Sequence, residues 1–92
     1  MYHVIKRDGK IAEFNIEKIA NAIKQAFEAC NKQNNDNIID FLALKVTANF
    51  EPKISNILVA VEDVHDSVES VLVQAGYADV AKAYILKRKN RE

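Results

Sequence analysis

The sequence comprises 92 residues, of which 49% are hydrophobic and 28% charged, a composition typical of one small globular domain. Its 13 basic and 13 acidic side chains give a formal net charge of zero, which argues against a nucleic-acid partner because general nucleic-acid binders are usually basic. A single cysteine excludes an internal disulfide, and no apolar run approaches the roughly 20 residues of a membrane helix, so we expect a cytoplasmic domain with no membrane partner.

The first predicted element is a β-hairpin. Val4 and Ile5 lead into the turn at residues 6–9, where Asp8-Gly9 is a pair that favours the positive φ of a tight turn. The chain then returns through residues 11–14. Asn15 follows as the expected N-cap of an amphipathic helix over residues 15–30, whose apolar side chains recur at helical spacing.

Three cations gather around this hairpin and helix start, namely Lys6, Arg7 and Lys18. The free N–H groups and the dipole of a helix N-terminus also attract negative charge, so the region suits an anion. The alternative is a hairpin with solvated charges, which composition by itself favours.

A polar loop over residues 31–37 precedes a second predicted helix over residues 38–50, with Asp36 or Asn37 as its cap. Its inner stripe consists of Ile39, Leu42, Ala43, Val46 and Phe50. A second apolar side consists of Ile38, Phe41, Leu44 and Ala48. Such a helix is either enclosed within the domain or presents a surface to a partner, including another copy of the chain.

Pro52 ends the second helix, and the β-branched residues 54–59 predict a strand that joins the hairpin. A third helix follows from Val61 to about residue 75, with Gly76 at its C′ position. The last helix covers residues 78–89. The predicted fold is therefore α+β, a small three-stranded sheet capping a four-helix arrangement in the order ββααβαα.

Basic side chains crowd the end of the last helix, namely Lys87, Arg88, Lys89 and Arg91. Favourable interaction with the negative end of the helix dipole accounts for most of them. The alternative interpretation is that Lys87 or Arg88 turns toward the anion site.

Several catalytic and nucleotide-binding motifs are absent from the sequence. With only Gly9 and Gly76, neither a Walker A loop nor a Rossmann fingerprint can be built, so a triphosphate would depend on side-chain cations and a helix N-terminus. No Ser-His-Asp set, paired-carboxylate site or HExxH motif is recognisable, and His3 and His65 are isolated. We expect neither catalytic residues nor a metal site in this chain.

Three motifs occur in a characteristic order. They are VIKRDG at residues 4–9 with Phe14-Asn15 and Lys18-Ile19 after it, VEDVHD at residues 61–66 with Val68-Glu69, and AKAYI at residues 81–85. Together they resemble the ATP-cone, the allosteric nucleotide-binding domain at the N-terminus of many ribonucleotide reductases. The resemblance covers nearly the whole chain, and the fold that it implies has the element order predicted above.

The resemblance implies that residues 1–92 form a single ATP-cone domain, an N-terminal fragment of a longer enzyme whose catalytic domain lies downstream. ATP or dATP would be its allosteric ligand, with an accompanying Mg²⁺ left open. Residues 69–72 and 81–85 look closest to the anaerobic, glycyl-radical class, a ribonucleoside-triphosphate reductase.

The resemblance also implies roles for individual residues. Lys6 and Arg7 would face the phosphates, with Lys18 and His65 nearby. The base would be lined by Val4, Asn15 and Ile19. Two departures put the nucleotide preference and the number of sites in doubt: Ala12 stands where some cones carry an acid, and Val61 where a hydroxyl residue often opens the third helix.

Two alternatives belong to other classes of protein. One is the nucleotide-sensing cone of a transcriptional repressor of reductase genes. That family carries a cysteine zinc ribbon before the cone, for which the residues before the first strand leave no room. The other is a protein-interaction domain without a ligand, which the apolar surface of the 38–50 helix suggests. Nucleotide would then fail to raise its melting temperature.

Overall fold

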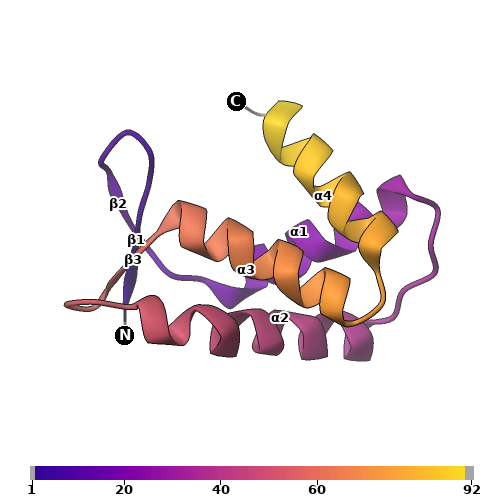
Figure 1. The fold of residues 1–92 in the computed structure, drawn as a ribbon, viewed down its shortest axis with the longest axis horizontal. Coiled ribbons are helices and arrows are strands. Elements are labelled where there is room, and N and C mark those ends of the chain that lie inside the picture. The colour runs from indigo at the N-terminus through magenta and orange to yellow at the C-terminus, as the bar shows by residue number, and fades with distance from the viewer. Residues whose placement is uncertain (1, 91–92) are drawn as a thin grey trace.

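The computed structural model describes residues 2–90, with the side chains of residues 2–88. Arg91 lies outside the described residues, as does the side chain of Lys89. The elements are β1 (His3–Ile5), β2 (Ile11–Glu13), α1 (Ile16–Ala29), α2 (Asp36–Phe50), a 3₁₀ turn (Glu51–Lys53), β3 (Leu58–Ala60), α3 (Val61–Gln74) and α4 (Ala78–Asn90). This order confirms the predicted α+β fold, and Figure 1 shows the small sheet at one end of the helical part.

The sheet has the strand order β2-β1-β3, so the N-terminal strand is central. β1 pairs with β2 in antiparallel register, with Val4 opposite Ala12. It pairs with β3 in parallel register, with Val4 opposite Val59. The parallel pairing follows from the long connection through α1 and α2, because parallel strands need a crossover.

The hairpin turn has the geometry that its sequence predicts. Gly9 has a φ of 85°, and its N–H donates to the Lys6 carbonyl at 2.9 Å. The Lys6 N–H donates to the Lys10 carbonyl at 2.8 Å, and the Asp8 carboxylate accepts from the Lys10 N–H at 3.0 Å. Asp8 and Gly9 therefore shape the loop on which Lys6 and Arg7 stand.

The predicted cap of α1 is confirmed, whereas the predicted cap of α2 is wrong. The Asn15 side chain accepts from the Glu17 N–H at 2.9 Å, as expected of an N-cap. At α2, however, Asn35 is the cap, and its side chain accepts from the Ile38 N–H at 2.9 Å. Asn35 has the extended backbone that a cap requires, whereas Asp36 and Asn37 already lie within the helix.

The predicted strand over residues 54–59 also begins too early in the sequence. The structure forms β3 only from Leu58, because Ser55 and Leu58 close a tight turn with backbone hydrogen bonds of 2.8 and 2.9 Å. Asn56 and Ile57, at its centre, have φ values of 52° and 59°. Positive φ is unusual for a β-branched residue such as Ile57, so its strand propensity pointed to the wrong conformation there.

The four helices enclose one hydrophobic core, in which α1 packs on α2 and α4, and α3 packs on the same two helices. The inner stripe of α2 is buried as predicted. On its other side, Phe41 is 57% and Leu44 61% exposed, so this helix presents an apolar surface rather than being enclosed. Gly76 lies at the C′ position of α3 with a φ of 91°, as predicted.

No helix within residues 2–90 combines the length and the apolar character that crossing a membrane would require.

Candidate functional site

A pocket of about 440 Å³ lies between the hairpin, α1, the first half of α3 and the end of α4. Every residue that the sequence predicts for the nucleotide site lines this pocket except Arg7: Val4, Lys6, Asn15, Lys18, Ile19, His65, Lys87 and Arg88. These residues come from three separate segments of the chain, which the fold brings together. Ligand pockets in proteins commonly measure about 300–1,000 Å³, so the volume suits a ligand of nucleotide size.

The lining combines apolar and basic side chains. The apolar side chains are Val4, Ala12, Phe14, Ile19, Ala22, Val61, Val64, Val68 and Tyr84. The basic side chains are Lys6, Lys18, Lys87 and Arg88, and Glu13 is the acidic one. Such a lining can receive a ligand that is apolar and flat at one end and strongly anionic at the other.

Residues on α1 reach the pocket because they share one helical face. Lys18, Ala22 and Gln25 follow one another at intervals of four and three residues, and all three line the pocket. The helical period alone therefore identifies Gln25, which none of the sequence motifs includes. Tyr84, from the motif at residues 81–85, also lines the pocket although it is only 8% exposed.

The start of α3 adds backbone donors beside the pocket. Its N-cap is Ala60, which has no side chain capable of capping, and the next residue, Val61, lines the pocket. The first N–H groups of a helix have no partner within the helix, so they favour an anion here. The absence of a hydroxyl at Val61 removes one side-chain donor from the same place.

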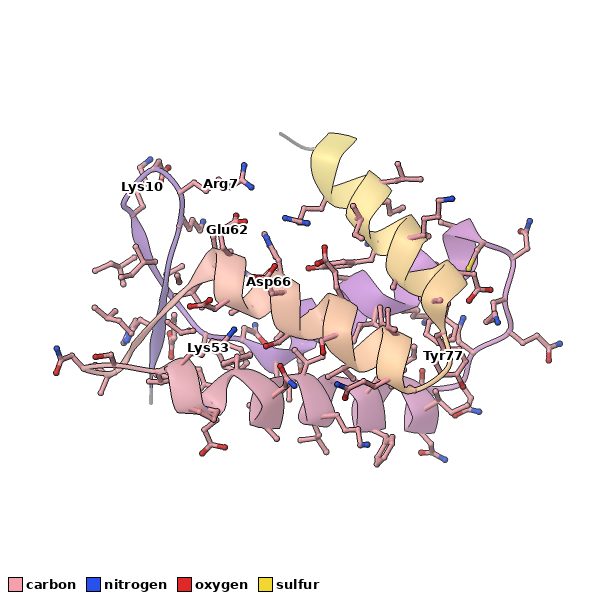
Figure 2. The ribbon with its side chains drawn as sticks, in the orientation of Figure 1. Arg7, Lys10, Lys53, Glu62, Asp66 and Tyr77 are labelled. Carbon is pink, nitrogen blue, oxygen red and sulfur yellow. The ribbon has the colours of Figure 1, made fainter. Side chains whose placement is uncertain are left out.

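Arg7 is directed to a carboxylate beside the pocket. Its Nε donates to Glu62 Oε1 at 2.7 Å, which joins the hairpin tip to the first turn of α3. Figure 2 shows the Arg7 and Glu62 side chains facing one another between the hairpin tip and the start of α3. The hydrogen bond from Arg7 lowers the pKa of Glu62 below its usual value, so this carboxylate is ionised at neutral pH.

Arg88 forms a second, less exposed cluster. Its Nη2 donates to Glu69 Oε1 at 2.7 Å, and its Nη1 lies 3.4 Å from His65 Nδ1. Only 18% of the Arg88 side chain and 23% of the Glu69 side chain are exposed. Burial, and then the Arg88 charge, lower the pKa of His65, so its imidazole is neutral at pH 7. Burial raises the pKa of Tyr84 to about 12, so its phenol keeps its proton.

Within residues 2–90, no group of three or more histidine, cysteine, aspartate or glutamate side chains is placed to hold a metal ion.

Comparison with known proteins shows similarity to one domain family over nearly the whole chain. Residues 2–92 match the ATP cone domain family. The chain is 36% identical over 94 residues to a ribonucleoside-diphosphate reductase subunit alpha of Chlamydia pneumoniae, covering 96% of this chain and 9% of that protein. It is 33% identical over 94 residues to an anaerobic ribonucleoside-triphosphate reductase of Haemophilus influenzae, covering 99% of this chain and 13% of that protein.

A vitamin B12-dependent ribonucleoside-diphosphate reductase of Thermoplasma acidophilum is 37% identical over 93 residues, covering 96% of this chain and 12% of that protein. The chain thus spans only about a tenth of the length of these relatives. The family match, in contrast, extends over nearly all of its own length. The chain belongs to the ATP-cone domain family.

Proposed function

We propose that this chain is an allosteric domain of a ribonucleotide reductase and that it binds ATP or dATP in the pocket between the hairpin and α1, α3 and α4. The observation that carries the proposal is the convergence of the predicted site residues, from both ends of the chain, on one pocket lined by apolar and basic side chains. The family match and the reductase relatives support the same function.

The chemistry of the lining residues suggests how the ligand lies. The base would pack on the apolar side chains of Val4 and Ile19, with Asn15 beside it. The phosphates would contact Lys6, Lys18, Lys87 and Arg88, with His65 nearby and Arg7 reaching in from beside the pocket. If Mg²⁺ accompanies the nucleotide, we expect phosphate oxygens and water to be its main ligands, since Mg²⁺ commonly binds with few protein ligands.

Removal of the Lys6 ammonium should weaken ATP binding by about tenfold or more, since a charge-assisted hydrogen bond contributes roughly 1.5–3 kcal/mol. Isothermal titration calorimetry with Lys6→Ala would measure this loss. Lys10→Ala is the matched control, because Lys10 stands on the same hairpin, is exposed and does not line the pocket.

The control should bind ATP like the unaltered chain. Equal affinity of Lys6→Ala and Lys10→Ala would mean that the phosphates lie elsewhere. If the unaltered chain binds no ATP and its melting temperature does not respond to nucleotide, the alternative of a ligand-free interaction domain replaces this proposal.

The proposed parent is a longer cytoplasmic reductase whose catalytic domain belongs to the same polypeptide. Similar identities to three kinds of reductase, 36%, 33% and 37%, do not discriminate between their classes. We favour the anaerobic class because residues 69–72 and 81–85 most resemble its cones. Sequencing the gene beyond the codon for Glu92 tests this, and a catalytic domain of another reductase class there would refute it.

A further inference from the structure

One carboxylate, that of Glu62, lies among nitrogen groups from three parts of the fold. Its Oε1 accepts from Arg7 Nε of the hairpin at 2.7 Å and lies 3.8 Å from His65 Nδ1 of α3. Its Oε2 lies 3.8 Å from Arg88 Nη1 of α4. Figure 2 shows Glu62 at the start of α3, below the Arg7 side chain.

The same three side chains are among those assigned above to the phosphates of the ligand. A carboxylate and a phosphate present similar anionic oxygens and make similar charge-assisted hydrogen bonds with a guanidinium. Glu62 therefore binds Arg7 as a phosphate of the ligand would bind it. The hydrogen bond to Glu62 directs the Arg7 side chain to a carboxylate beside the pocket, and Arg7 is the one predicted site residue that does not line it.

The two arginines differ in how firmly their carboxylates hold them. The Arg7 and Glu62 side chains are 55% and 47% exposed, and ion pairs so exposed to water are weak. The Arg88 and Glu69 side chains are only 18% and 23% exposed, and a well-formed pair with that burial is screened much less by solvent. Arg7 is therefore the exchangeable cation, whereas Arg88 stays fixed on Glu69.

We propose that Glu62 is an internal competitor for the ligand's phosphates: binding transfers Arg7 from the Glu62 carboxylate to a phosphate, so that Glu62 sets the affinity of the site. This inference rests on the proposed function for the identity of the ligand. The transfer would also have a structural consequence, because the Arg7–Glu62 ion pair joins the hairpin tip to α3. Transfer of Arg7 breaks that connection, so occupancy of the pocket changes how the hairpin is attached to the helices.

The test removes the negative charge and keeps the shape, with Glu62→Gln. ATP binding should then become tighter by about two- to fivefold, the range expected when a competing exposed ion pair is lost. Asp66→Asn is the matched control, since it makes the same charge change one turn further along α3, at an exposed residue (Figure 2). Its affinity for ATP should stay within about twofold of the unaltered chain, because Asp66 is exposed and does not line the pocket.

Inorganic tripolyphosphate is the second ligand, because it carries the phosphates without a nucleoside. Calorimetry with ATP and with tripolyphosphate, on the unaltered chain, Glu62→Gln and Asp66→Asn, distinguishes the competitor role of Glu62 from the proposed nucleotide function. ATP binding that Glu62→Gln leaves unchanged or weakens overturns the competitor role while the proposed function stands. If ATP binds none of the proteins but tripolyphosphate binds Glu62→Gln more tightly than the unaltered chain, the competitor role stands and the nucleotide function falls. Binding of neither ligand refutes both.

Discussion

His65 is a residue whose environment, rather than its neighbours in sequence, determines its protonation. Burial and the nearby Arg88 lower its pKa in the folded state, whereas in the unfolded chain it has the ordinary value of about 6.5. Below that pH the unfolded chain takes up a proton that the folded chain does not yet accept. The free energy of unfolding must therefore decrease as the pH falls below about 6.5.

Urea unfolding at pH values above and below about 6.5 measures this decrease, and His65→Gln removes the group responsible. The variant should lose stability less steeply than the unaltered chain over the acidic part of the range. Parallel pH profiles for the two proteins would contradict the assignment of a lowered pKa to the folded state.

At the scale of single elements, the start of α2 depends on one asparagine. Asn35 accepts the Ile38 N–H, so Asn35→Ala should lower the free energy of unfolding by about 1 kcal/mol through loss of the cap. Asn37→Ala is the natural control, because Asn37 is exposed, lies inside the helix and has no capping role. Its effect should remain within about 0.5 kcal/mol.

Denaturant unfolding of the two variants provides the measurement. A larger loss for Asn37→Ala than for Asn35→Ala would mean that Asn37, one of the two caps predicted from the sequence, caps the helix instead.

At the scale of the whole molecule, we propose that the outer face of α2 takes part in assembly. Phe41 and Leu44 are exposed there, which suits a contact with another chain or domain. ATP and dATP differ by one ribose hydroxyl. A difference of about 1–3 kcal/mol in their coupling to assembly would be enough for a regulatory switch.

Sedimentation of the proposed parent protein with ATP, with dATP and without nucleotide tests this expectation. The profiles should differ between ligands, and Phe41→Ser should suppress the difference. Val73→Ser is the control, because Val73 is a similarly exposed apolar residue on α3, at 54%. Coincident profiles for the unaltered protein would show that the domain does not act through assembly, and a shift unaffected by Phe41→Ser would place the contact on another face.

The elements that could be predicted from the sequence depend on local interactions. Apolar spacing defined the inner stripe of α2, and Asp8-Gly9 and Gly76 marked positions that require positive φ. Asn15 could be named as a cap because its partner, the Glu17 N–H, is two residues away. Family motifs, rather than any local physical rule, indicated which distant segments would share a site.

Only the tertiary structure decided the features that depend on distant contacts. Leu58 pairs in register with His3 of β1, and the turn before it overrides the strand propensity of Ile57. The ion pair between Arg7 and Glu62 joins residues 55 positions apart, which neither helical nor strand periodicity can anticipate. The sequence determined which side chains carry charge, whereas the tertiary structure, which places the hairpin tip beside the start of α3, determined which of those charges meet.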